Sequence, residues 1–198
     1  NYPGFVGTGF DLAMKFYEQV SALNVEFQFE NITAVEKENG IFKLTCESGN
    51  VFEAKSVIIA SGATRRKLEI KGENEFTGRG VSYCATCDGA FYTDKVVAVY
   101  GGGNTALEDA IYLSNTSSKV YLIHRRDEFR GEKTLVDIIK KIDNIELVLS
   151  HTIEGLVGEK QLEAITVLDK KTNETRDIVV DGLFVAIGQV PNNKPFAS

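Results

Sequence analysis

The run Lys95-Val96-Val97-Ala98-Val99-Tyr100-Gly101-Gly102-Gly103-Asn104-Thr105-Ala106 joins an apolar strand to a glycine turn. The residues that follow, Asn104 to Ser114, have the pattern of an amphipathic helix. A strand, a glycine turn and a helix form a site for a pyrophosphate, because the first N–H groups of the helix are unpaired and the helix dipole favours an anion. The run therefore predicts the start of a dinucleotide-binding domain of the Rossmann type.

Residues in and just after the glycine turn have expected roles in the pyrophosphate site. Gly101 and Gly103 permit a tight turn and a close approach of the backbone to the cofactor. Ala106 is small enough to let the helix pack on its strand. Asn104 and Thr105 open the helix at the same corner, and we predict that all of these residues bind the cofactor.

A basic cluster follows the next apolar strand, Lys119–Ile123. It begins with His124, Arg125 and Arg126, about twenty residues after the glycines, where the fold places its ribose contact. A site for NAD usually carries an acidic residue there, whereas guanidinium groups bind phosphate oxygens in pairs. With Arg130 one turn further on, the expected cofactor is NADP. We include His124 in the predicted site as a supporting residue, not a catalyst.

Two cysteines, Cys84 and Cys87, lie just before the glycine-turn strand. A structural disulfide and half of a zinc site are the alternatives to a redox role. A zinc site needs further ligands, and Cys46, His124 and His151 are scattered along the chain, so no metal is predicted. A disulfide across two residues closes too short a loop to stabilise much, whereas this spacing is common in thiol exchange. The adjacency indicates electron transfer between a nicotinamide cofactor and a disulfide.

Two further side chains bear on the cysteine chemistry. Asp88 directly follows the pair and could move protons to and from a thiolate, or it could be a turn residue before Gly89. Cys46 ends the alternating stretch Ile41–Cys46, and we expect it to be an inert, half-buried thiol.

The composition narrows the class of protein. The 198 residues are 43% hydrophobic and 25% charged, which suits a globular chain with one or two cores. A net charge of −6 argues against a general nucleic-acid binder. We find no apolar stretch long enough for a membrane span and no signal peptide at the start. A redox pair among three cysteines fits the reducing cytoplasm.

The order of elements predicts an α/β fold. Asp11–Leu23 has helical spacing, and short strands with hairpin signals follow, beginning with Val25–Phe29. Val57–Ala60 is fully apolar, as in a buried parallel strand, and Gly72–Gly80 is polar and turn-rich, as in a hinge. We predict two Rossmann-like, three-layer nucleotide-binding domains, the first of them truncated. Their expected limits are 1–72 for the first, partial domain, 73–188 for the second domain, which carries the dithiol and the predicted NADP site, and 189–198 for a return to the first.

Three motifs together match a known family. The segments Cys84–Tyr92, Gly101–Glu108 and His124–Arg130 closely resemble the low-molecular-weight thioredoxin reductases. The resemblance extends from Asn1-Tyr2-Pro3-Gly4 to the strand that ends at Gly188. It implies a homodimeric flavoprotein that passes electrons from NADPH to FAD, then to its own disulfide, and then to thioredoxin.

The resemblance also implies roles for single residues. Cys87 would face the flavin, Cys84 would exchange with thioredoxin, and Asp88 would be the acid or base. The three arginines named above would hold the 2′-phosphate of NADPH.

The chain departs from the family at both ends. A full member opens with a strand and G-x-G-x-x-G motif for FAD and closes with a Gly-Asp segment, and neither is present. Asn1 would approach the isoalloxazine, and Ser61, Gly62 and Ala63 would approach the adenosine half of FAD. We therefore expect an internal piece of a reductase that binds FAD weakly or not at all by itself.

Two other functions stay open at this point. One is a related flavin disulfide reductase with a different acceptor protein. The other is an NADP-binding, dithiol-exchange module that never carried a flavin. The absence of the FAD motif favours the second alternative, but the remnants at Asn1 and at residues 61–63 favour truncation.

Overall fold

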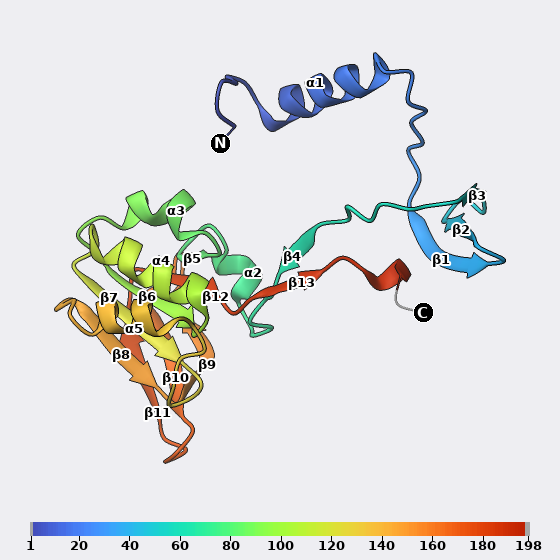
Figure 1. Cartoon of the computed structure of the whole chain (residues 1–198). Coiled ribbons are helices and arrows are strands. Elements are labelled where there is room, and N and C mark those ends of the chain that lie inside the picture. The colour runs from blue at the N-terminus through green and yellow to red at the C-terminus, as the bar shows by residue number, and fades with distance from the viewer. Residues whose placement is uncertain (1, 197–198) are drawn as a thin grey trace. The chain divides into compact units, whose positions relative to one another are not determined.

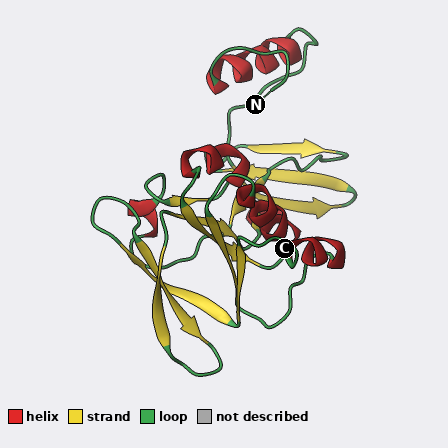
Figure 2. Ribbon diagram, turned by 90° about the vertical axis from the view of Figure 1, so that its left-hand side faces the viewer, coloured by secondary structure: helices red, strands yellow, loops and turns green. Residues whose placement is uncertain are grey.

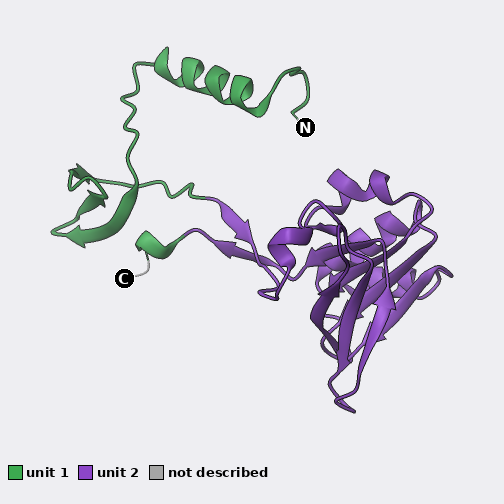
Figure 3. Cartoon of the chain, turned by 180° about the vertical axis from the view of Figure 1, so that it is seen from behind, with its two compact units in different colours: residues 1–61, 193–198 green, residues 62–192 purple. Residues whose placement is uncertain are grey.

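The computed structural model describes residues 2–196, which form the elements labelled in Figure 1. The chain divides into two compact units (Figure 3). One comprises residues up to 61 together with residues from 193 onward, and the other comprises residues 62–192. We describe each unit by itself.

The first unit consists of a helix, a small sheet and a short 3-10 turn. Its elements are α1 (Gly9–Ser21), β1 (Ile32–Glu38), β2 (Ile41–Cys46), β3 (Val51–Ala54) and η2 (Lys194–Phe196). Thr8 is the N-cap of α1: its hydroxyl accepts the N–H of Asp11, while the Asp11 carboxylate accepts the N–H of Thr8. The strands form an antiparallel sheet in the order β1-β2-β3, as the hairpin signals predict.

Two predicted strands of this unit are wrong. Val25–Phe29 and Val57–Ala60 are both irregular. The second was expected to be a buried parallel strand, yet Ile58 is 93% exposed. A single strand cannot pair its backbone groups or bury its side chains alone, and no described strand lies in register beside either segment.

The second unit is built on a parallel sheet. Its strands are β5 (Val81–Ser82), β6 (Val96–Gly101), β7 (Lys119–His124), β8 (Ile145–Leu149) and β12 (Gly182–Ala186). They lie in the order β5-β12-β6-β7-β8, and every neighbouring pair is parallel. Helices α4 (Asn104–Ser114) and α5 (Lys133–Ile139) connect β6 to β7 and β7 to β8. The predicted strand-helix-strand unit is confirmed, and α4 has the predicted bounds.

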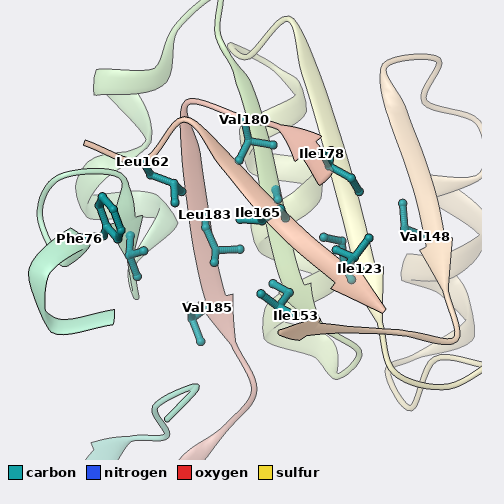
Figure 4. Packing of buried hydrophobic residues seen from close by; sticks show 13 residues of the cluster. Phe76, Ile123, Val148, Ile153, Leu162, Ile165, Ile178, Val180, Leu183 and Val185 are labelled. Carbon is teal, nitrogen blue, oxygen red and sulfur yellow. The ribbon is translucent and has the colours of Figure 1, made fainter. Parts of the chain in front are cut away.

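Both faces of the parallel sheet are covered. An antiparallel sheet of β9 (His151–Val157), β10 (Ala164–Asp169) and β11 (Thr175–Val179) packs on one face, and helices α4 and α5 pack on the other (Figure 2). Side chains alternate between the layers, since Leu183 and Val185 point to the antiparallel sheet and Phe184 to the helices. Figure 4 shows Leu183 and Val185 beside Ile153 and Ile165 of that layer. The predicted three-layer α/β class is confirmed for this unit.

The segments around the predicted hinge also belong to the second unit. Strands β4 (Ala63–Arg65) and β13 (Gln189–Pro191) form a two-stranded antiparallel ribbon. Residues 72–80 contain helix α2 (Glu73–Phe76), and the Phe76 ring lies in the core. A Cβ atom on Gly80 would lie 2.3 Å from Cβ of Leu162. The segment thus contacts the core at Phe76 and Gly80, while the expected hinge and the domain limits of 72/73 and 188/189 stay predictions.

One negative finding concerns membranes. Among the helices in residues 2–196, none is long and apolar enough to cross a bilayer.

Candidate redox and nucleotide-binding site

Cys84 and Cys87 are joined in a disulfide, with their Cα atoms 5.2 Å apart. Cys84 is the N-cap of the short helix α3 (Ala85–Asp88), and Cys87 is the third residue of that helix. The N–H groups of Cys87 and Asp88 donate to the Cys84 carbonyl oxygen at 3.2 and 3.1 Å. Cys84 is half-buried and Cys87 is exposed. The expected pairing is present, whereas its redox role stays a prediction.

Ser82, the last residue of β5, forms hydrogen bonds with both ends of the segment from Cys84 to Asp88. Its hydroxyl donates to Oδ2 of Asp88 at 2.6 Å and accepts the N–H of Cys84 at 3.1 Å. Ser82 is only 5% exposed. Sequence reasoning missed this residue, because a serine in a short apolar strand carries no signal of its partner six positions further on.

Glu73 is a second buried residue that sequence reasoning missed. Its carboxylate accepts the N–H groups of Leu68 and Glu69 at 2.8 and 2.9 Å, and the hydroxyl of Tyr83 also donates to it. Burial, followed by the hydrogen bond and charge of Glu73, raises the pKa of Tyr83 above its usual range. Because Tyr83 precedes Cys84, Glu73 ties residues 68–69 to the segment that carries the disulfide.

The glycine turn lies at the end of β6, where α4 begins. A Cβ atom on Gly101 would lie 2.3 Å from the carbonyl oxygen of Ala186 and 2.7 Å from Cβ of Ala106. A Cβ atom on Gly103 would meet nothing within 4 Å, and Gly103 caps α4 without a side-chain hydrogen bond. The turn is thus closed on the protein side and open at the helix N-terminus, the arrangement that the motif predicts.

The predicted basic cluster lies beside this turn. The N–H groups of Arg130 and Gly131 donate to the carbonyl oxygen of Gly102 at 2.7 and 3.1 Å. Asn104 and Glu132 also exchange two hydrogen bonds: the Asn104 amide donates to the Glu132 carboxylate at 2.9 Å and accepts the Glu132 N–H at 2.8 Å. The structure therefore brings together the glycine turn and the loop that follows β7, as predicted.

The guanidinium groups of this loop face solvent. Arg125, Arg126 and Arg130 are exposed, and none of the ion pairs found within residues 2–196 involves them. The neighbouring acid, Asp127, is engaged elsewhere, because it pairs with Lys171 at 2.6 Å and accepts the hydroxyl of Ser150. The loop thus presents three guanidinium groups to solvent, and its Asp127 carboxylate is held by Lys171 and Ser150.

His124 lies beneath the glycine turn. It is 6% exposed, and its ring stacks on Phe129 with the ring centres 5.5 Å apart. Its Nε2 atom is buried, with no hydrogen-bond partner among the residues that the structure describes. Burial, opposed by a hydrogen bond with the backbone of Glu128 and reinforced by the charges of the nearby arginines, lowers the pKa of His124 and so favours the neutral ring. This placement supports the turn, and direct contact with a cofactor stays a prediction.

Four residues are predicted to approach FAD: Asn1, Ser61, Gly62 and Ala63. Asn1 lies outside the described residues. Ser61, Gly62 and Ala63 are exposed, and the carbonyl oxygen of Gly62 accepts the N–H of Asn192 at 3.0 Å. Residues 2–61 contain no parallel strand that leads through a glycine turn into a helix, so this part of the chain builds no cradle for the FAD pyrophosphate.

The remaining cysteine is Cys46, at the end of β2. It is 3% exposed, more deeply buried than expected, and burial followed by the charge of Glu30 raises the pKa of its thiol. A high pKa keeps the thiol protonated and unreactive. The prediction of an inert thiol agrees with this environment. No cluster of three or more metal-binding side chains is found in residues 2–196.

Comparison with known proteins identifies the family. The profile of the pyridine nucleotide-disulphide oxidoreductases matches residues 5–198. The chain belongs to this family. The family is named for a pyridine nucleotide and a disulfide. The second unit contains both a glycine turn of the nucleotide-binding type and a disulfide.

Individual relatives of the family narrow the comparison. The chain is 43% identical to the thioredoxin reductase of Helicobacter pylori over 196 residues, which cover 98% of this chain and 63% of that protein. It is 40% identical to the thioredoxin reductase of Treponema pallidum, over 96% of this chain and 62% of that protein. The chain thus spans less than two thirds of the length of these curated relatives.

Solved structures of thioredoxin reductases are also similar to this chain. The thioredoxin reductase of Lactococcus lactis aligns with a TM-score of 0.75 and 35% identity, over 100% of this chain and 65% of that one. The thioredoxin reductase from Giardia duodenalis aligns with a TM-score of 0.80 and 31% identity, over 98% of this chain and 64% of that one.

Proposed function

We propose that this chain is the nicotinamide-binding and dithiol-bearing portion of a thioredoxin reductase, which transfers two electrons from NADPH to thioredoxin. The observation that carries the proposal is that one folded unit holds both the Cys84–Cys87 disulfide and the glycine turn at Gly101–Gly103. The thioredoxin reductases of Helicobacter pylori and Treponema pallidum match along almost the whole chain and support the choice within the family.

We propose NADPH as the nicotinamide cofactor. The residues present fit a dinucleotide, since a Cβ atom on Gly101 would collide with the backbone, while Gly103 adjoins open space at the start of α4, where no side chain bonds to the helix N–H groups. Gly101, Gly103 and the N–H groups from Asn104 to Ala106 would hold the pyrophosphate. The three exposed guanidinium groups of Arg125, Arg126 and Arg130 would hold the 2′-phosphate. When bound, NADPH would supply a hydride.

FAD is proposed for the longer protein and not for this chain alone. Residues 2–61 build no pyrophosphate cradle, so we derive no step through the flavin here. We further propose that the whole protein is a cytoplasmic homodimer that binds neither nucleic acid nor membrane, as the resemblance and the net charge of −6 suggest.

The chemistry of the dithiol can be written from this chain's own residues. In the reduced form, the Cys84 thiolate attacks the disulfide of the acceptor, which forms a mixed disulfide and releases one acceptor thiolate. The Cys87 thiolate then attacks Sγ of Cys84, which restores the internal disulfide and releases the second acceptor thiolate. Two electrons pass to the acceptor. Asp88 would take the proton of the Cys87 thiol and return it to a departing thiolate.

Trapping of the mixed disulfide tests the acceptor and the order of the cysteines. The probe is a single-cysteine thioredoxin activated as its thionitrobenzoate disulfide, so each coupling releases one coloured thiolate. With Cys46→Ala in both, we expect the Cys87→Ser chain to couple through Cys84 much faster than the Cys84→Ser chain. Equal rates would overturn the assignment of Cys84. Faster coupling to an activated glutaredoxin than to thioredoxin would overturn the proposed acceptor.

A further inference from the structure

We propose that Ser82 is a positioning residue for the dithiol, because it holds the Asp88 carboxylate in the place where it exchanges protons with the cysteine pair. This inference rests on the proposed function of Asp88 as the acid or base. It adds a residue that the cysteine motif itself does not contain, since Ser82 lies on β5, two positions before Cys84.

The hydrogen bonds of the Ser82 hydroxyl have a fixed direction. The hydroxyl has one proton to donate. Its Oγ atom lies 2.6 Å from Oδ2 of Asp88 but 3.4 Å from the carbonyl oxygen of Cys84. The shorter contact to a carboxylate takes the proton. The oxygen lone pairs then accept the N–H of Cys84 at 3.1 Å. One atom thus connects the carboxylate to the backbone of the first cysteine.

Burial makes this connection rigid. Ser82 is 5% exposed and pairs with Phe184 in the register between β5 and β12, so its hydroxyl is anchored to the central sheet. Asp88, by contrast, is only half-buried and ends the four-residue helix α3. A half-exposed aspartate on so short a helix has several rotamers available, and a buried donor selects one of them.

The titratable neighbour of Asp88 does not compete in the neutral pH range. Tyr92, on the 3-10 turn η1 (Gly89–Tyr92), is the side chain whose pKa the Asp88 charge affects. Burial, then the charges of Asp88 and Asp181, raises the pKa of Tyr92, so it stays neutral below pH 9. A change in reactivity between pH 6.5 and pH 9 therefore does not come from ionisation of Tyr92.

The experiment measures thiol-disulfide exchange in the 198-residue chain, without any cofactor. The Cys46→Ala chain is reduced and mixed with dithiobis(nitrobenzoate), and each dithiol reduces one probe molecule to two thionitrobenzoate ions while it forms the Cys84–Cys87 disulfide. Wild type, Ser82→Ala, Ser82→Thr, Asp88→Asn and the double variant Ser82→Ala/Asp88→Asn are compared from pH 6.5 to pH 9. Ser117→Ala is the matched control, because Ser117 is equally buried and its hydroxyl donates to the carbonyl oxygen of Tyr92.

We expect Ser82→Ala to slow exchange roughly tenfold at pH 6.5, as the loss of a hydrogen bond to a charged group would. The rates should converge near pH 9, where thiols of ordinary pKa ionise without a base. Ser82→Thr, which keeps the hydroxyl, should restore the wild-type profile. In the Asp88→Asn background, Ser82→Ala should have no further effect.

The outcomes separate this inference from the function on which it rests. If Asp88→Asn leaves the profile unchanged, the proposed role of Asp88 fails. If Asp88→Asn slows exchange but Ser82→Ala does not, or if Ser82→Ala acts equally in both backgrounds, only the role of Ser82 is overturned. Should Ser82→Ala fail to fold, Asp88→Glu gives the answer, because it keeps the charge but displaces the carboxylate, and a wild-type profile for it would contradict the inference.

Discussion

Gly102 lies directly against the ring of His124. A Cβ atom on Gly102 would come within 2.2 to 2.6 Å of three ring atoms, whereas a Cβ atom on the adjacent Gly103 would meet nothing. The ring itself is fixed, since it is buried and stacked on Phe129. The glycine turn is therefore shaped by a side chain from the next strand, and the two adjacent glycines are required for different reasons.

Alanine substitutions should separate those reasons. We expect Gly102→Ala to destabilise the chain by about 3 kcal/mol, because the ring cannot yield without repacking. Gly103→Ala should cost at most about 1 kcal/mol, the loss on replacing a glycine N-cap. It should instead weaken NADPH binding, since the added methyl enters the open space at the turn. Urea denaturation and NADPH titration of both variants measure the two effects, and a Gly102→Ala chain of wild-type stability would show that the ring moves freely.

Glu73 should contribute strongly to the stability of the second unit. Its buried carboxylate accepts two backbone N–H groups and the Tyr83 hydroxyl. Glutamine offers one acceptor oxygen in place of two, so Glu73→Gln leaves one of these partly buried donors without its partner. We expect a loss of about 2 kcal/mol in the free energy of unfolding. Glu75→Gln on the exposed side of α2 is the control and should change stability by less than about 0.5 kcal/mol. Equal effects of the two substitutions would refute the prediction.

Asp109 on α4 should make stability depend on pH. Burial, opposed by Arg65 and reinforced by Glu108, raises its pKa to about 6. Because this value lies above the ordinary 3.8, the folded chain holds the proton more tightly than the unfolded chain. The resulting stabilisation is complete below about pH 3.8 and is lost as the pH rises through about 6.

Asp109→Asn should remove this contribution. At pH 7.5 we expect the variant to be more stable than wild type by about 1 kcal/mol, a figure reduced for the partial solvent exposure of the side chain. The difference should shrink toward zero by pH 4. Denaturation midpoints at several pH values measure it, with the exposed Asp137→Asn on α5 as the control. A difference that stays constant with pH would show that Asp109 is not the group responsible.

The sequence predicted the strand-helix-strand core of the second unit well, because the sequence patterns that indicate it are local. The strand, the glycine turn and helix α4 are contiguous, and the continuous apolar run in β6 is what a strand needs in a sheet covered on both faces. The same reasoning failed at Val57–Ala60, because an apolar run becomes a buried strand only where other strands lie beside it.

The buried polar residues were beyond the reach of sequence reasoning. Ser82 and Glu73 have their partners on other turns or loops, so their importance is set by tertiary contacts and not by spacing or residue type. The contact of Gly102 with His124 is of the same kind. The motif predicted that glycines are needed there, but not which neighbour excludes a side chain.

The most direct test of the proposed nucleotide site is a calorimetric titration of the chain with NADPH and NADH. Wild type is compared with Arg125→Ala/Arg126→Ala and with the control Arg176→Ala, an exposed arginine on β11. We predict that wild type and Arg176→Ala prefer NADPH, and that the double variant loses about tenfold or more in NADPH affinity while its affinity for NADH changes little. Equal losses of affinity for NADPH and NADH, or a wild type that binds both equally well, would contradict the proposal that the second unit binds NADPH.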